Sequence, residues 1–277
     1  MNLVLLEAEE VAEALGGRGE GALAPPLRFE LELGDRRARH LLEVVRVTVG
    51  ALVRVGLVDV ALGSAEVLAV ATGRCRLAVT LERAAPPPAP VHLILAVPRP
   101  KVLRRAVAIA SSFGVARIDL TNAWRVDKSY LGSPALSEAS LARAARDGAE
   151  QGALGRVPAI DVHRRLMGLI DGLIDGRIDE RTDRPNSGSS GERAAPTPPP
   201  LRVIAHPKAA RSLEHVVVPG ARQPVILAIG PEGGWIAREV ETFEARGFAA
   251  VTLGESILRV EAAVAGALAQ LELLRRL

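Results

Sequence analysis

The sequence contains little cysteine, aromatic residue or lysine. Cys75 is the one cysteine among 277 residues, which excludes an internal disulfide framework and is typical of a protein in a reducing compartment. Aromatic residues make up 3% of the chain whereas hydrophobic residues make up 48%. We therefore predict a globular protein whose core is built mostly from Ala, Val, Leu and Ile.

Segments that would target the chain to a membrane are also missing. The first thirteen residues contain four glutamates and no basic residue, unlike a signal or transit peptide. No uncharged apolar run is long enough to span a bilayer. We expect a soluble, cytoplasmic protein that makes no membrane contact.

Common metal and nucleotide motifs are absent as well. There is no Cys-x-x-Cys, no His-Glu-x-x-His, no Walker loop and no Gly-x-Gly-x-x-Gly, and the five histidines lack metal-ligand spacing. The sequence therefore predicts no metal site and disfavours an ordinary dinucleotide-binding fold.

Basic residues are unevenly distributed, although the formal net charge is only +3. Residues 91–171 hold twelve Lys and Arg against seven Asp and Glu. Local basic patches suit contacts with phosphates, but arginine-rich solvated faces are also common. The charge distribution alone does not decide whether the protein binds nucleic acid.

The first third of the chain predicts a small β-barrel, because short β segments alternate with glycines. The expected strands are Leu27–Leu33, Leu52–Leu57, Ala65–Ala71 and Arg76–Leu81, with a short helix at Arg37–Val45. We predict a domain over residues 1–85, followed by a stiff Pro-rich linker over 86–90.

From residue 91 on, strands alternate with helices, which predicts an α/β domain over 91–277 with a mainly parallel sheet covered on both faces. The expected strands are Val91–Val97, Val115–Leu120, Leu201–Ala205, Val225–Ile229 and Ala249–Leu253, and the helices Lys101–Phe113, Ser137–Gln151, Ala237–Arg246 and Ala262–Arg276. Residues 171–200 fit neither pattern and are interpreted as a low-complexity insertion without a catalytic role.

Two turn-rich loops are the most informative motifs. One is Gly230-Pro231-Glu232-Gly233-Gly234, and the other runs from Leu253 to Glu261. Taken alone, the first is more often a tight turn than a site, and Arg259 and Glu261 can be ordinary charges at a helix start. Together the loops leave the same edge of the predicted sheet, where open α/β sheets bind ligands. Their glycines allow backbone groups to approach a ligand closely, so we predict a shared cofactor site.

Longer motifs add a family resemblance. They are His40–Arg46 with Gly50, Val97–Arg105, Arg125–Tyr130 with Ser133-Pro134, Glu150-Gln151, Val157-Pro158 and the two C-terminal loops. In this order and spacing the chain resembles the RsmE family of 16S ribosomal RNA uridine-N3 methyltransferases of the SPOUT superfamily, over nearly its whole length apart from residues 171–200. The resemblance implies a SPOUT-type α/β knot preceded by a small PUA-like RNA-binding β-barrel, and a homodimer.

The resemblance also implies the chemistry. The protein would be an enzyme that uses S-adenosylmethionine to methylate N3 of a uridine in 16S ribosomal RNA of the small subunit. Arg259 would stabilise the developing uracil anion, and Glu261 would orient Arg259 or take part in proton removal. The residues implied for the cofactor are Leu227, Ile229, Gly230, Glu232, Gly233, Gly234, Leu253, Gly254, Ile257 and Leu258.

Candidates for RNA contact combine positive charge with aromatic character, which suits unpaired bases and their backbone. They are His40, Arg46, Arg99, Lys101, Arg104, Arg125, Lys128 and Tyr130. For each a simpler interpretation exists: His40 and Arg46 on a barrel surface, the basic residues on a solvated face, and Tyr130 packed inward.

Two alternative functions stay open. The chain has Ser256 and Ala262 where the family commonly has Arg and Thr. These departures suit a catalytically weak RNA-binding ribosome assembly factor that keeps the cofactor pocket. A SPOUT enzyme with another RNA target would share the pocket and differ in its product.

Overall fold

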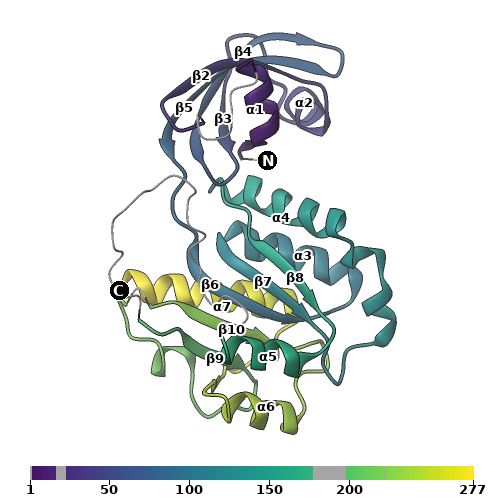
Figure 1. The fold of residues 1–277 in the computed structure, drawn as a ribbon, viewed down its shortest axis with the longest axis vertical. Coiled ribbons are helices and arrows are strands. Elements are labelled where there is room, and N and C mark those ends of the chain that lie inside the picture. Colours follow the sequence, from purple (N-terminus) through teal and green to yellow (C-terminus); the bar gives the residue numbers. More distant parts are fainter. Residues whose placement is uncertain (1, 17–22, 177–197, 222) are drawn as a thin grey trace. The chain divides into compact units, whose positions relative to one another are not determined.

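The computed structural model describes residues 2–16, 23–176, 198–221 and 223–277, which divide into two compact units. Within these residues the first unit comprises 2–87 together with 149–157, and the second comprises 88–148 and 158–277. Each unit is built around its own sheet (Figure 1).

The first unit contains a curled, mostly antiparallel sheet of five strands in the order β1-β3-β4-β5-β2. Strand β1 pairs in parallel with β3, and the other neighbours are antiparallel. Two register shifts interrupt the pairing of β4 with β5, and such bulges bend a strand and increase its twist. The strands are β1 Val4–Leu6, β2 Leu27–Leu33, β3 Leu52–Leu57, β4 Ala61–Ala71 and β5 Arg74–Ala84.

Helices of the first unit close one end of this sheet's core. Helix α1 spans Ala8–Ala14, and α2 spans Arg36–Arg39 and continues as a π-helix over His40–Val45. The helix predicted at Arg37–Val45 is confirmed.

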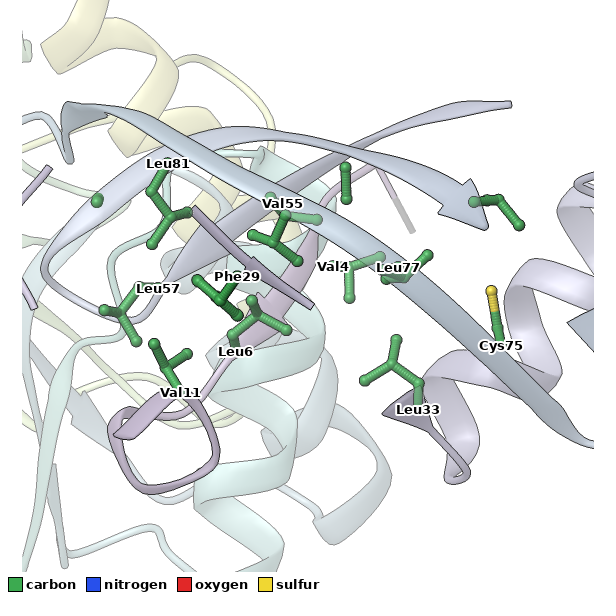
Figure 2. Packing of buried hydrophobic residues seen from close by; sticks show 14 of the residues in the cluster. Val4, Leu6, Val11, Phe29, Leu33, Val55, Leu57, Cys75, Leu77 and Leu81 are labelled. Carbon is green, nitrogen blue, oxygen red and sulfur yellow. The ribbon is translucent and has the colours of Figure 1, made fainter. Parts of the chain in front are cut away.

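The core of the first unit is aliphatic, as the composition predicts. Figure 2 shows side chains from β1, α1 and the curled sheet meeting in one cluster. Phe29 is the aromatic residue of this cluster, and Cys75 is buried within it, which raises the pKa of its thiol. A buried, protonated thiol behaves as a small hydrophobic side chain.

The second unit contains a six-stranded sheet in the order β11-β9-β10-β6-β7-β8, in which every pair of neighbours is parallel. The predicted mainly parallel sheet is confirmed. Because all strands run the same way, their carboxyl ends meet at one edge. The strands are β6 Ala89–Ala96, β7 Val115–Thr121, β8 Ala159–His163, β9 Leu201–Ala205, β10 Val225–Ile229 and β11 Ala249–Val251.

Five α-helices accompany this sheet in the described residues, and α3 packs against α7 (Figure 1). Helix α3 ends at Ser112, with Phe113 as its C-cap, and Gly114 follows with a φ of +69°. Across the described ranges, no helix is both long and apolar enough to traverse a bilayer. The helices are α3 Pro100–Ser112, α4 Glu138–Gly152, α5 Leu166–Ile174, α6 Ala237–Glu244 and α7 Val260–Arg276.

The segment interpreted as an insertion begins inside a helix. Helix α5 buries Leu169, Ile170 and Leu173, and Asp171 accepts a hydrogen bond from Nε of Arg246 at 2.8 Å. The interpretation of 171–200 as irregular is therefore wrong for residues 171–174. Residues 177–197 lie outside the described residues.

A buried charged cluster joins β6, β7 and β8. Asp119 is fully buried, and its two carboxylate oxygens lie 2.5 Å from Nε2 of His92 and 2.8 Å from Nε2 of His163. Arg117 donates to the same carboxylate at 2.9 and 3.0 Å and pairs with Asp161 at 2.7 Å. Burial alone raises the pKa of Asp119, but the hydrogen bonds from His163, His92 and Arg117 outweigh it and hold this pKa far below its usual range.

Candidate functional site

A cavity of about 570 Å³ lies at the carboxyl edge of the parallel sheet, within the second unit. Its walls come from the segments that follow β9, β10 and β11, together with the start of α7 and one residue that follows β7. The lining residues are Arg125, Ala205–Lys208, Ile229–Ala237, Thr252–Gly254, Ser256–Leu258, Val260 and Ala263.

The loop after β10 forms the floor of this cavity. Strand β10 is buried along its whole length, and the chain turns at once after Ile229. The turn is closed by a 2.7 Å hydrogen bond from the Gly234 N–H to the Pro231 carbonyl, with Gly234 at a φ of +70°. A residue with a β-carbon is disfavoured in that left-handed conformation, so the glycine is required for the turn.

At two further glycines of this loop, Gly230 and Gly233, there is little room for a side chain. A β-carbon on Gly230 would come within 3.2 Å of Nε1 of Trp235, and one on Gly233 within 3.0 Å of Cδ of Arg125. Both distances are tighter than ordinary packing contacts. The floor therefore exposes backbone rather than side chains to the cavity.

Side chains and backbone from two other strand ends hold this loop. Nη1 of Arg125, which follows β7, donates to the Gly233 carbonyl at 2.5 Å. The backbone N–H of Arg99, which follows β6, donates to Oε1 of Glu232 at 2.9 Å. The predicted RNA contacts Arg99 and Arg125 are thus brought to the predicted cofactor loop.

The loop after β11 forms another part of the cavity wall. Nε2 of Gln270, on α7, donates to the Leu253 carbonyl at 2.9 Å, and Oγ1 of Thr252 donates to the Gly254 carbonyl at 2.8 Å. Ile257 lies on the cavity wall, and 87% of its side chain is exposed to solvent. An anchored loop that presents an exposed apolar side chain to a cavity is suited to contact an apolar part of a ligand.

Nine of the ten residues predicted for the cofactor line this cavity. The exception is Leu227, which lies within β10 and is fully buried. It packs behind the floor rather than on its surface.

The two residues predicted for catalysis lie at the rim. Arg259 is exposed and precedes α7, between two residues that line the cavity, Leu258 and Val260. Glu261 is in the first turn of α7, and its Oε1 lies 3.6 Å from Nη1 of Arg105 on α3. In the described residues the ion pair of Glu261 is with Arg105 and not with Arg259.

The other predicted RNA contacts of the second unit lie outside the cavity. Lys101 and Arg104 are exposed on α3 and line, with Arg105, a separate cavity of about 540 Å³ that also includes Asp147. Lys128 and Tyr130 lie in a 3₁₀-helix over Lys128–Gly132, with Lys128 exposed and Tyr130 half-buried.

His40 and Arg46 belong to the first unit. His40 begins the π-helix and is half-buried, and partial burial together with the positive charge of Arg36 lowers its pKa. Arg46 is exposed and has a φ of +59°. Of the neighbouring arginines, Arg36 pairs with Glu150 at 3.0 Å and Arg37 with Glu10 at 2.6 Å, so these two serve the packing of the unit.

Several lining residues were missed by the sequence analysis. His206, Pro207 and Lys208 follow β9, and their position directly after a predicted strand could have revealed them. Burial lowers the pKa of His206. The negative charge of Glu244 raises this pKa, and the positive charge of Lys208 lowers it further. His206 therefore favours the neutral form, which can accept as well as donate a hydrogen bond.

Trp235 was also missed, and it bears on the ligand that the cavity fits. Its indole is buried, and Nε1 has no hydrogen-bond partner in the described part of the chain. A buried polar atom usually has a partner. Its ring helps to form an apolar slot with exposed backbone, which fits a flat, nearly neutral group with hydrogen-bonding edges.

Comparison with known proteins identifies relatives over most of the chain. Residues 85–272 match the family model described as RNA methyltransferase domain. Ribosomal RNA small subunit methyltransferase E of Treponema pallidum (strain Nichols) is 28% identical over 272 residues, covering 97% of this chain and 90% of that protein. The protein of the same name from Synechocystis sp. (strain ATCC 27184 / PCC 6803 / Kazusa) is 48% identical over 50 residues, 18% of this chain and 16% of that protein.

Solved structures share the fold. A ribosomal RNA small subunit methyltransferase E from Neisseria gonorrhoeae bound to S-adenosyl methionine superposes with a TM-score of 0.64 at 18% identity, covering 98% of this chain and 97% of that one. The methyltransferase Lpg2936 from Legionella pneumophila, in complex with the cofactor SAM, gives the same TM-score, identity and coverage.

Proposed function

Because this chain belongs to the RNA methyltransferase family, we propose that it transfers a methyl group from S-adenosylmethionine to N3 of a uridine in 16S ribosomal RNA of the small subunit. The predicted resemblance to the RsmE family is confirmed by the relative from Treponema pallidum, which aligns over 97% of this chain. The single observation that supports the proposal best is the cavity at the carboxyl edge of the family's domain, lined by nine of the ten predicted cofactor residues.

The cavity suits the adenosine part of the cofactor. Backbone groups around Gly230 and Gly254 would provide hydrogen bonds to the adenine edge, and Ile257 and Leu258 would cover its face. Leu227 would support the floor from behind, because it is buried in β10.

When bound, S-adenosylmethionine would supply an electrophilic methyl group on sulfur, and the residues at the rim would promote loss of the N3 proton as the S–CH3 bond gives way to the N3–CH3 bond. The N3–H of uracil is a poor nucleophile until it is deprotonated, so a cation beside the ring should promote the reaction. Arg259 would stabilise the uracil anion from the rim, and Glu261 would orient Arg259 or take part in proton removal. Holding the reacting atoms in line can contribute roughly 7–11 kcal/mol, and a positioned base about 10²–10⁴-fold.

The finer features of the fold belong to the same proposal. Residues 1–85 would form a PUA-like RNA-binding barrel within the first unit, joined by residues 86–90 to a SPOUT-type knotted domain over 91–277, and the protein would act in the cytoplasm as a homodimer. The structure adds residues 149–157 to the first unit and begins β6 at Ala89, inside the predicted linker. His40, Arg46, Arg99, Lys101, Arg104, Arg125, Lys128 and Tyr130 would contact RNA. The curled sheet of the first unit and the exposed basic residues of α3 support this assignment.

The test is methyl transfer from labelled S-adenosylmethionine into small ribosomal subunits that lack the modification, with the product nucleoside identified by mass spectrometry. N3-methyluridine at one position is the expected result. A different methylated nucleoside would assign another RNA target, and cofactor binding without transfer would favour an assembly factor. In that last case, Ser256→Arg with Ala262→Thr should restore transfer.

A further inference from the structure

One of the two tryptophans, Trp124, is exposed to solvent and precedes a residue that lines the cavity. Trp124 is 79% exposed, whereas its neighbours Ala123 and Val126 are buried and Trp235 is 6% exposed. Large aromatic side chains stabilise a fold mainly through burial, so an indole in solvent contributes little to this fold. Its exposure requires another explanation.

The backbone that carries Trp124 is held firmly. Its N–H donates to Oε1 of Glu239 on α6 at 2.8 Å, and Oε2 of the same carboxylate accepts from the Ile236 N–H at 3.0 Å. One carboxylate therefore ties the loop after β7 to the loop after β10. The Val126 N–H closes the turn by donating to the Ala123 carbonyl at 3.1 Å.

The same loop reaches the cavity. Arg125 lines the cavity and donates to the Gly233 carbonyl at 2.5 Å, so the residue next to Trp124 is fixed on the cavity floor. The side chains of Trp124 and Arg125 therefore lie apart. The guanidinium of Arg125 is on the cavity floor, and the indole of Trp124 is in solvent. The indole is thus an unburied aromatic face on an anchored backbone, at the margin of the methyl-donor site.

The chain around Trp124 carries more positive than negative charge. Arg125 and Lys128 follow it and are exposed, against one exposed carboxylate, Asp127. A basic segment that carries an exposed aromatic ring suits single-stranded nucleic acid, because phosphates pair with the cations while a base stacks on the ring. An interface with another protein would instead favour an aromatic ring with few charges at its centre.

We propose that Trp124 is a stacking platform for an unpaired base of the RNA substrate, which positions the strand beside the methyl-donor cavity. The inference rests on the proposed function, since it assumes an RNA substrate. Trp124 would contact the substrate directly. It would define which RNA conformations can present a uridine to the cavity.

Steady-state kinetics with small ribosomal subunits test the proposal. Trp124→Ala should lower kcat/KM about 5- to 150-fold, mainly through a higher KM, the range that the loss of one base–aromatic stack produces. Trp124→Phe keeps an aromatic face and should remain within a few-fold of the natural protein. The matched control is Val218→Ala, a 64% exposed apolar residue in the segment that precedes β10. It should change nothing.

Cofactor affinity, measured by calorimetry, should be unchanged in both Trp124 variants. Acrylamide should quench Trp124 fluorescence in the free protein, and saturating RNA should protect it, with the protected signal missing in Trp124→Phe. If Trp124→Ala retains its KM and kcat within twofold, or RNA leaves the quenching unchanged, the proposal is overturned. Sedimentation adds a further check: loss of an oligomer in Trp124→Ala would assign the ring to contact with a second copy of the chain.

These outcomes separate the proposal from the function on which it rests. A natural protein that transfers no methyl group refutes the proposed function, whatever the variants do. RNA protection of Trp124 in that inactive protein would keep the stacking role. An active natural protein with an equally active Trp124→Ala variant refutes the stacking role alone.

Discussion

Nη1 of Arg105 lies 3.6 Å from Oε1 of Glu261, so an ion pair joins α3 to the first turn of α7 next to the cavity. The Arg105 side chain is 63% exposed and that of Glu261 is 20% exposed. Exposed pairs of this kind contribute about 0.2–1 kcal/mol to stability. The carboxylate is therefore held near the rim by a weak interaction, which leaves it free to serve the reaction.

The first prediction separates the two uses of Glu261. Glu261→Gln should lower kcat by about 10²-fold or more if the carboxylate takes up the proton, because glutamine cannot act as a base. Arg105→Ala should lower kcat less than about fivefold, since it removes only the partner. Single-turnover methyl transfer measures both. Equal losses in the two variants would instead assign Glu261 to holding α7 against α3.

The second prediction concerns Arg259. Arg259→Ala should lower kcat about 10²–10³-fold, the effect of losing one group that stabilises a developing negative charge, while cofactor affinity stays within threefold. Arg276→Ala is the matched control, because Arg276 is an exposed arginine at the other end of α7. Retained methyl transfer in Arg259→Ala would remove this residue from the mechanism.

The third prediction uses the close contact between Gly233 and Arg125. Gly233→Ala places a β-carbon 3.0 Å from Cδ of Arg125, so one of the two must move, and cofactor affinity should fall about tenfold. Arg125→Ala removes the obstacle, and the double variant should bind the cofactor better than Gly233→Ala alone. Calorimetric titration of the four proteins gives the coupling energy. Strict additivity would show that the two residues act independently.

Local patterns predicted the regular strands well. The bounds Leu27–Leu33, Leu52–Leu57, Leu201–Ala205 and Val225–Ile229 agree with β2, β3, β9 and β10. Strand β10 is a continuous apolar run, and β2 alternates apolar with charged residues, so both carry a pattern that sequence periodicity can detect. Strand β1 is three residues long and β8 has exposed residues such as Asp161, so neither carries a pattern that sequence periodicity can detect. Strands β1 and β8 are recognised only from the neighbouring strands with which they pair.

The parts of the candidate site that lie within one short stretch of sequence were predicted. The parts that come together from distant stretches were missed. The glycine loops were found because turn residues after an apolar strand leave a signal in one short stretch. Trp124 and His206 were not singled out, because their importance depends on other strands ending at the same edge. The pair between Arg105 and Glu261 spans two helices far apart in sequence, and no spacing rule predicts it.

The fourth prediction concerns the buried carboxylate of Asp119. Hydrogen bonds from His163, His92 and Arg117 depress its pKa in the folded protein below the usual value of 3.8. A depressed pKa stabilises the fold fully at pH values above that of the unfolded carboxyl group, and this contribution is lost as pH falls toward the folded value. Asp119→Asn should therefore lower the free energy of unfolding by about 3 kcal/mol at pH 7, the cost of removing one charge from a buried ion pair.

Urea unfolding at several pH values checks this sign. The difference between the natural protein and Asp119→Asn should shrink as the pH falls below 4, because the natural carboxylate then loses its advantage. Asp161→Asn is the control: its side chain is 54% exposed and pairs with the same Arg117, so it should cost less than about 1 kcal/mol. A difference that grows on acidification would mean that Asp119 is protonated in the folded protein, contrary to its hydrogen bonds with three donors.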